Sequence, residues 1–182
     1  MDRGEVLMAG IGGMGVLVAG QILSRAAFKR HKHASYVPSY GAARRGGNSE
    51  YTVIFSDKRI SSPLLDQAQA VVLLDSSQFG AYECRVRPGG LFIVDKAGLD
   101  ADREKKDYEL YTLPAMEAAV SMGASVLVGL IMLGACIAIT GLISPKLIED
   151  ELRIRYGDDE KLLARNLDAF KRGHKLGASA KQ

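Results

Sequence analysis

A cluster of glycines after a short apolar run near the start of the chain constrains the fold most. Gly10, Gly12 and Gly15 have the G-x-G-x-x-G spacing, between the apolar residues 6–9 and a helix-forming segment at 16–29. Glycines let the backbone turn tightly and let a bound group approach without an intervening Cβ. The helix that follows points its unpaired N–H groups and the positive end of its dipole at whatever lies over the turn. We therefore predict a strand–turn–helix unit that binds an anion, with phosphate as the favoured group.

Three interpretations of this turn stay open. Dinucleotide binding expects an acidic residue about 20 positions later, at the end of the second strand, to hold the ribose hydroxyls. Residues 26–38 contain no acidic residue, and the first later one is Glu50, which argues against ordinary NAD binding. In a second interpretation the glycines serve only close packing of helix on strand. In the third, the turn binds a different phosphate-bearing ligand or a partner chain.

A second unusual segment, residues 39–48, has the sequence SYGAARRGGN. It is a poor helix and a poor strand, because three of its ten residues are glycine and two are arginine. Glycine backbones can form N–H nests, and guanidinium groups bind phosphate or carboxylate with two parallel hydrogen bonds. The segment is therefore predicted to be an anion-binding loop, with a solvated basic loop as the alternative.

Composition excludes several classes of function. The 182 residues are enough for one domain with a proper core, and a formal charge of +3 is too small to indicate nucleic-acid binding. Cys84 and Cys136 match no metal or disulfide spacing, and the three histidines are scattered, so this chain alone is not expected to hold zinc or an iron–sulfur cluster. Two spaced cysteines fit a reducing cytoplasm, and the charged first residues do not resemble a signal peptide.

Hydrophobic patterns along the chain predict alternating strands and helices. Expected strands are residues 6–9, 34–37 (closed by Pro38), 49–56, 71–74, 91–94 and 108–113. Expected helices are residues 16–29, a segment starting near Pro63, 78–87, 118–144, 145–156, and 160–172 ended by Gly173. We predict an α/β, Rossmann-like three-layer domain over residues 1–175, with a mainly parallel sheet, helices on both faces and a flexible tail at 176–182.

Two aspartates follow buried strands of this expected sheet. Asp75 and Asp95 lie just past the carboxyl ends of their strands, at the edge where α/β sheets bind ligands. Either is a candidate site residue. Helix capping is the alternative role, and it is the one we favour for both.

Residues 118–144 contain no charged side chain, and a run of that length could span a membrane. Four glycines interrupt the run, however, and no aromatic belt or flanking basic cluster accompanies it. A helix that is apolar on all sides is also typical of one buried between a sheet and a partner subunit. We favour the buried helix and expect no membrane association, and the apolar surface suggests an oligomer.

Taken together, three segments resemble the gamma subunit (or gamma domain) of the 2-oxoacid:ferredoxin oxidoreductases, the pyruvate, ketoisovalerate and 2-oxoglutarate oxidoreductase family. They are GIGGMGVLVAGQILSRAA at 10–27, PSYGAARRGGNSEYTVIFSDKRISSP at 38–63 and VLVGLIMLGACIAITGLIS at 126–144. The likeness extends over nearly the whole chain. The paired order of the two glycine motifs is far more specific than either motif alone, and the lead-in Ser39-Tyr40-Gly41 is most similar to the 2-oxoglutarate branch.

The resemblance implies an oxidoreductase subunit that is inactive alone. The whole enzyme would oxidatively decarboxylate a 2-oxoacid, with 2-oxoglutarate as the favoured substrate, use coenzyme A as co-substrate and pass electrons to ferredoxin. Thiamine diphosphate, Mg²⁺ and iron–sulfur clusters would reside on companion alpha and beta subunits, with a ferredoxin-like delta subunit as a further candidate partner. Implied cofactor-binding residues are Gly10, Gly12, Gly13, Gly15, Tyr40, Gly41, Arg44, Arg45, Gly46 and Gly47; no catalytic residue or metal ligand is implied in this chain.

Some positions depart from the family pattern. Met14 stands where relatives often have glutamine, Arg44 follows an alanine where they often have a glutamate, and Gly129 stands where they often have asparagine. Two functions of other classes therefore stay open beside the enzyme subunit. One is a stand-alone nucleotide-binding module, either NAD-dependent or a sensor, and the other is an assembly protein held at a membrane by residues 118–144.

Overall fold

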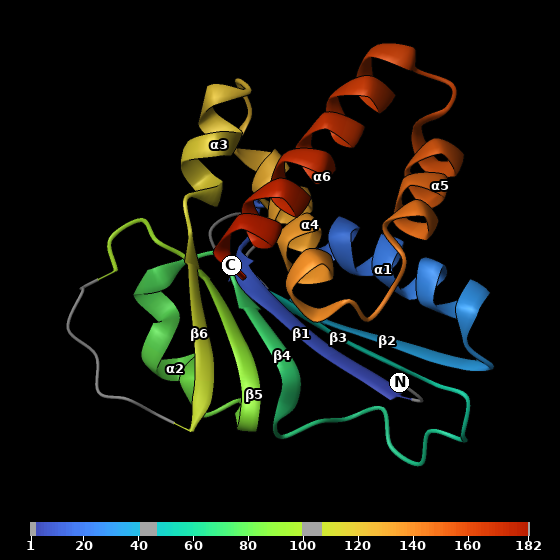
Figure 1. Cartoon of the computed structure of the whole chain (residues 1–182), viewed down its shortest axis with the longest axis vertical. Coiled ribbons are helices and arrows are strands. Elements are labelled where there is room, and N and C mark those ends of the chain that lie inside the picture. The colour runs from blue at the N-terminus through green and yellow to red at the C-terminus, as the bar shows by residue number, and fades with distance from the viewer. Residues whose placement is uncertain (1–2, 41–46, 100–106, 182) are drawn as a thin grey trace.

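A computed structural model shows one six-stranded sheet with helices on both faces (Figure 1), and it describes residues 3–40, 47–99 and 107–181. The strand order is β2-β3-β1-β4-β5-β6. The strands are β1 (Arg3–Ile11), β2 (His33–Tyr40), β3 (Asn48–Ser56), β4 (Ala68–Leu73), β5 (Val86–Asp95) and β6 (Tyr108–Leu113). β1 pairs in parallel with β4, β4 with β5, and β5 with β6, whereas β3 is antiparallel to both β1 and β2. The expected α/β class with a mainly parallel sheet is confirmed.

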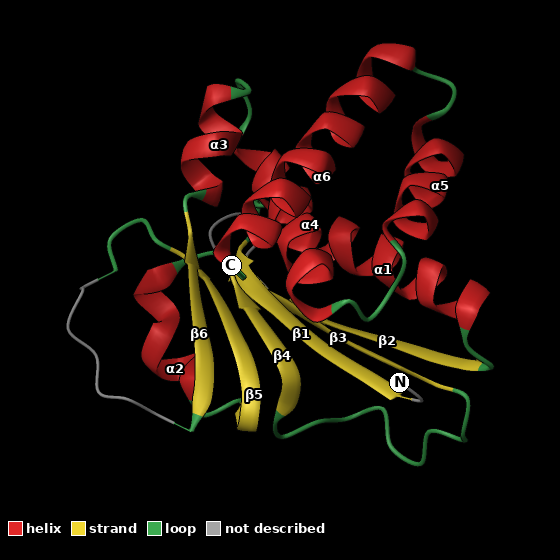
Figure 2. Cartoon of the chain, viewed as in Figure 1, coloured by secondary structure: helices red, strands yellow, loops and turns green. Residues whose placement is uncertain are grey.

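The helical layers on the two faces are very unequal (Figure 2). One face carries α1 (Val16–Arg30), α3 (Ala115–Ser121), α4 (Val128–Thr140), α5 (Pro145–Tyr156) and α6 (Glu160–Ala180). Among the α-helices of the described residues, only α2 (Phe79–Glu83) lies on the other face. Side chains of β1 alternate between the two cores: Val6 and Met8 pack with the larger helical layer, and Leu7 and Ala9 pack with α2. The central strand is therefore buried on both faces, as its continuous apolar sequence requires.

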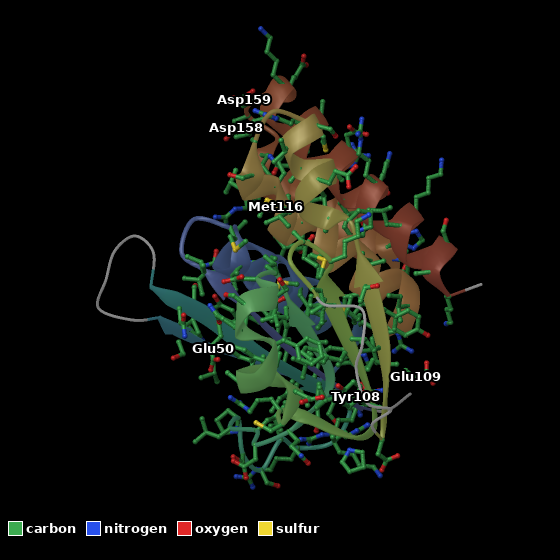
Figure 3. The ribbon with its side chains drawn as sticks, turned by 90° about the vertical axis from the view of Figure 1, so that its left-hand side faces the viewer. Glu50, Tyr108, Glu109, Met116, Asp158 and Asp159 are labelled. Carbon is green, nitrogen blue, oxygen red and sulfur yellow. The ribbon has the colours of Figure 1, made fainter. Side chains whose placement is uncertain are left out.

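The short helix α2 is tied to the sheet by two tyrosine–glutamate hydrogen bonds. Tyr82 on α2 donates to Glu50 on β3 over 2.6 Å, and Tyr108 on β6 donates to Glu83 on α2 over 2.6 Å. Glu50 and Tyr108 lie on opposite sides of α2 in Figure 3. Burial and the bond to Glu50 raise the pKa of the Tyr82 hydroxyl well above its ordinary value, so the hydroxyl remains a donor.

Several expected element boundaries were wrong. Residues 57–67 form an irregular connection rather than a helix starting near Pro63, because only four residues separate this proline from β4. The helix expected at 78–87 ends at Glu83, and β5 already begins at Val86. Pro38 does not close its strand: β2 is an edge strand, where a missing N–H is tolerated, and Pro38 pairs with Tyr51.

The long uncharged segment is not one helix. It contains the end of α3, a turn at Gly123, the 3₁₀ turn η2 (Ser125–Leu127) and α4, which Gly141 ends in a left-handed conformation with φ 64°. Among the helices in the described ranges, none is both long enough and apolar enough to cross a bilayer. The apolar surface of α4 is covered by α6 of the same chain, so the expectation that a partner subunit buries this surface was wrong for α4.

Glycines allow α4 and α6 to lie unusually close together. A Cβ built on Gly173 of α6 would lie 1.8 Å from the carbonyl oxygen of Ile131, and one on Gly134 of α4 would lie 2.2 Å from that of Phe170. A Cβ on Gly177 of α6 would lie 2.5 Å from the carbonyl oxygen of Ala135. Gly173 therefore does not end the last helix as expected; α6 continues to Ala180, and residues 176–180, expected to belong to a tail, are helical.

The two cysteines differ in accessibility, which gives a simple test of the core. Cys84 is exposed, whereas Cys136 on α4 is completely buried, and burial raises the pKa of its thiol to about 12. Because the thiolate is the reactive form, we expect a maleimide at pH 8 to label Cys84 at least about 100-fold faster than Cys136. Labelling followed by mass spectrometry measures this ratio, with Cys84→Ser as the control. Equal rates in the folded chain would contradict the burial of α4.

Candidate functional site

The glycine-rich turn lies at the carboxyl end of β1, between Ile11 and Val16. Gly13 and Gly15 have φ values of 101° and 76°, in the left-handed region that favours glycine. β4, the neighbour of β1, ends at the same edge, and chain crossovers from these two strands lead to helices on opposite faces of the sheet. This is the type of edge at which open α/β sheets bind ligands.

The glycines of the turn have two different roles. A Cβ on Gly10 would lie 3.0 Å from Leu74 Cβ, and one on Gly15 would lie 2.5 Å from the carbonyl oxygen of Val126. These two residues serve close packing, as one of the sequence interpretations held. Gly13 is exposed, and a Cβ there would meet nothing within 4 Å. Gly13 is therefore the glycine of the turn that faces open space.

The second glycine motif meets the first next to this exposed glycine. Gly12 N–H donates a hydrogen bond to the carbonyl oxygen of Gly47 over 2.9 Å, and β3 starts at the next residue. Tyr40 is the last residue of β2 and pairs with Ser49. The other residues expected to bind a cofactor here, Gly41, Arg44, Arg45 and Gly46, lie outside the described residues.

The start of α1 has the electrostatics of an anion site. Its N-cap, Gly15, has no side chain, and its first turn contains no acidic residue. The N–H groups and the positive dipole end of this 15-residue helix are thus not neutralised by the helix itself. Backbone donors at a glycine turn and at a helix start bind phosphate or carboxylate oxygens.

Gln78 was missed by the sequence analysis. It ends the 3₁₀ turn η1 (Ser76–Gln78) after β4, and its side-chain amide donates to Asn48 Oδ1 over 3.1 Å and to Asp75 Oδ2 over 3.5 Å. Within the described ranges its Oε1 atom is buried without a hydrogen-bond partner. The signal that could have indicated this residue is its place three positions after Asp75, at the ligand-binding edge.

The two aspartates considered from sequence are caps, as favoured. Asp75 accepts from Ser77 N–H over 3.1 Å at the start of η1. Asp95, which is 2% exposed, accepts from Ala97 N–H over 3.0 Å and from Met116 N–H over 2.6 Å. Met116 lies in the first turn of α3, above the end of the sheet in Figure 3, so Asp95 caps that helix from β5.

The strand order of the sheet distinguishes this turn from a dinucleotide-binding Rossmann site. There, an acidic residue at the end of the second strand holds the ribose, and that strand is next to the first one. Here β3 lies between β1 and β2, so the end of β2 is about 10 Å from β1, twice the usual strand spacing. A ribose bound at the turn would be out of reach of the second strand.

Comparison with known proteins decides the family. The profile of the family described as "Pyruvate ferredoxin/flavodoxin oxidoreductase" matches residues 5–176. The chain belongs to this family. The match covers most of the chain and confirms the resemblance drawn from the two glycine motifs.

Relatives within the family place the chain among gamma-type subunits. It is 30% identical over 179 residues to the 2-oxoglutarate synthase subunit KorC of Methanocaldococcus jannaschii, and the alignment covers 96% of this chain and 94% of KorC. It is 32% identical over 171 residues to the ketoisovalerate oxidoreductase subunit VorA of Methanothermobacter marburgensis. That alignment covers 93% of this chain but only 35% of VorA, so this chain spans about a third of the length of VorA. The gamma subunit of the keto/oxoacid ferredoxin oxidoreductase from Geobacter sulfurreducens has the same fold, with a TM-score of 0.82, 27% identity and 100% coverage of both chains. The expected class, a subunit of a 2-oxoacid oxidoreductase, is confirmed.

Two of the departures from the family pattern are in direct contact. Met14 folds its sulfur back to 3.3 Å from Ile11 N, and its carbonyl oxygen accepts from Gly129 N–H over 3.0 Å. A Cβ on Gly129 would lie 2.8 Å from backbone atoms of Met14 and Gly15. An asparagine at position 129 would therefore fit only if α4 or the glycine-rich turn shifted. The close contact between the two requires glycine at this position. Arg44 lies outside the described residues.

Proposed function

We propose that this chain is the gamma subunit of a thiamine diphosphate- and CoA-dependent 2-oxoacid:ferredoxin oxidoreductase, and that its glycine-rich edge binds a phosphate group of coenzyme A. The observation that carries the proposal is the hydrogen bond from Gly12 to Gly47, because it joins the two motifs at the sheet edge, next to the exposed Gly13. The family membership supports the enzyme class.

The chemistry of the residues at this edge fits a phosphate. Gly13 leaves room for a ligand atom against the backbone, and α1 begins three residues later with no acidic residue in its first turn. Arg44 and Arg45 precede Gly47 by three and two residues in the sequence, and both carry a positive charge. These groups would bind and orient the co-substrate; bond-making chemistry would belong to the thiamine diphosphate, Mg²⁺ and iron–sulfur clusters of companion subunits.

We further propose 2-oxoglutarate as the substrate and alpha and beta subunits as the partners, in the cytoplasm. The lead-in Ser39-Tyr40-Gly41 and the likeness to KorC, a 2-oxoglutarate synthase subunit, support this choice, whereas the similarity to VorA supports ketoisovalerate as the competitor. An untagged pull-down from the native source, followed by thiamine and iron assays, tests the partners. Rates of the recovered complex with 2-oxoglutarate, ketoisovalerate and pyruvate then test the substrate.

Arg45→Ala in the reconstituted complex tests the binding edge. Loss of a charge-assisted contact to phosphate costs about 1.5–3 kcal/mol, so we expect the KM for coenzyme A to rise at least about tenfold. The KM for the 2-oxoacid should change little. Arg153→Ala is the matched control, because the Arg153 side chain is exposed and its one ion pair within the described ranges is with Glu149 at 3.9 Å. An unchanged KM for coenzyme A would contradict the role of this edge.

The second candidate, a stand-alone nucleotide-binding module, predicts a different result. It would bind NAD as an isolated colourless chain with submicromolar affinity, measured by calorimetry. The position of β3 between β1 and β2 argues against it. Submicromolar binding combined with failure to recover companion subunits would favour it over the enzyme subunit.

A further inference from the structure

A second pocket lies at the other end of α1, away from the glycine-rich turn. It is about 450 Å³ in volume and lies between the end of α1, the end of α4, the start of α5 and the middle of α6. Its polar lining residues are Arg30, His31, Ser144 and His174. Because α1 has 15 residues, this pocket is about 22 Å from the turn and cannot be part of the same ligand site.

The lining of this pocket is basic. It contains one arginine and two histidines, and no aspartate or glutamate. In the part of the chain that the structure describes, neither Arg30 nor His174 makes an ion pair within 4 Å. No lining residue therefore neutralises the charge of Arg30 or His174 in the described ranges, whereas His31 pairs with Asp57, outside the lining, at 3.4 Å.

His31 is the most informative member of this lining. Its side chain is 3% exposed and packs against Phe55, with ring centroids 5.0 Å apart. Its Nδ1 atom lies 3.4 Å from Asp57 Oδ1 and makes no hydrogen bond within the described residues. Since Nδ1 is buried on the Asp57 side, Nε2 is the polar atom of this ring that is left for the pocket. A protonated ring would offer Nδ1–H to Asp57 and Nε2–H to a ligand.

The start of α5 contributes donors from the opposite side. Ser144, its N-cap, makes no side-chain hydrogen bond to the helix, and Pro145 follows as the first helical residue. Pro145 has no N–H, and Leu147 N–H already donates to Ser144 O over 3.0 Å. The positive end of the α5 dipole and the remaining N–H groups of its first turn thus face the pocket, and that turn has no acidic residue.

Basic residues at the end of a helix often only complement its dipole, but the nearby carbonyl groups already have other partners. Ala27 O accepts from His31 N–H, and Ile137 O accepts from Gly141 N–H, each over 2.9 Å. Lys181 Nζ donates to Ile139 O over 3.0 Å at the end of α4. The side chains of Arg30, His31 and His174 are thus not needed to satisfy these carbonyl groups.

We propose that this pocket binds an oxyanion, the phosphate or carboxylate group of a small molecule. Arg30 would supply the charge and two parallel N–H groups, the α5 start would supply backbone donors, and the two histidines would bind the remaining oxygens. This site is independent of the glycine-rich edge and of the activity proposed above.

Nuclear magnetic resonance titrations of the full chain test the proposal. Inorganic phosphate and acetate are added in separate experiments at pH 6.5, with ionic strength held constant by sodium chloride. We expect saturable shifts of the His31 and His174 ring signals and of the Lys146 and Leu147 amides. The anion with the lower dissociation constant identifies phosphate or carboxylate as the bound group.

Variants locate the site. Arg30→Gln and His174→Gln should each weaken binding, Arg30→Gln by about tenfold. Arg25→Gln is the matched control, because Arg25 is on the same helix but does not line this pocket, and its dissociation constant should equal that of the unchanged chain. Circular dichroism shows whether each variant is folded. Shifts confined to residues 12–16, a response reproduced by chloride, or equal weakening by Arg25→Gln and Arg30→Gln would overturn the proposal.

Discussion

Gly173→Ala is expected to destabilise the protein by about 3 kcal/mol, although alanine favours helices over glycine by about 1 kcal/mol elsewhere. The added Cβ would lie 1.8 Å from the carbonyl oxygen of Ile131, which is about half of an ordinary contact distance. The neighbour is backbone, so no side-chain rotation relieves the clash, and α6 must move away from α4. Urea unfolding followed by circular dichroism measures the change in the free energy of unfolding.

Gly80→Ala is the control for this prediction. Gly80 is also helical, and a Cβ there would meet nothing within 4 Å. Its replacement should leave stability unchanged or raise it by up to about 1 kcal/mol. If Gly173→Ala were as stable as the control, α6 could not pack on α4 as described.

Asp95→Ala should also cost about 3 kcal/mol. Its carboxylate accepts two backbone hydrogen bonds in a site that is 2% exposed, and alanine would leave the N–H groups of Ala97 and Met116 without this acceptor. An unsatisfied buried donor costs about 1–3 kcal/mol, and bonds to charged acceptors are at the stronger end. The same urea experiment measures this loss.

Asp75→Ala is the matched comparison, because Asp75 caps η1 from a half-buried position with a single backbone bond of 3.1 Å. Its loss should cost about 1 kcal/mol. Asp95→Asn keeps the shape and one acceptor oxygen, and it should be intermediate. Equal effects of Asp75→Ala and Asp95→Ala would show that the cap supplied by β5 does not hold α3.

Elements whose limits are defined by residues close together in the sequence were predicted correctly. The strand at Tyr108–Leu113 and the helix ending at Tyr156 were both predicted with their observed ends, because alternating or periodic apolar residues and a following breaker define them. The α/β class followed from the alternation of such elements.

Features that depend on distant neighbours were not predictable. Gly173 has the signature of a helix end, and only the approach of α4 makes it an interior residue of α6. Pro38 has the signature of a strand end, and only the edge position of β2 makes it tolerable. The antiparallel placement of β3 between β1 and β2 likewise leaves no mark in the residues of β3 itself.

Some features of the candidate site could likewise be predicted from the sequence, and others depend on distant contacts. The spacing of Gly12 and Gly13 and the position of Gly47 before a strand were visible in sequence, and the structure joins them. Their role in binding stays a prediction. For Gln78 the sequence offered only its place three positions after Asp75. Its importance rests on a contact to Asn48, 30 positions away, and on an oxygen without a partner in the described ranges.

The close contact of α4 and α6 has a consequence for biosynthesis. α4 is apolar on every side, and the helix that covers it is encoded after it and after α5. While the ribosome is still making α6, the nascent chain must carry α4 with an uncovered apolar surface, which is the condition under which partly made proteins aggregate or recruit chaperones. A release of the chain before Gly173 would leave that surface open permanently, so quality control should remove such truncated products rapidly.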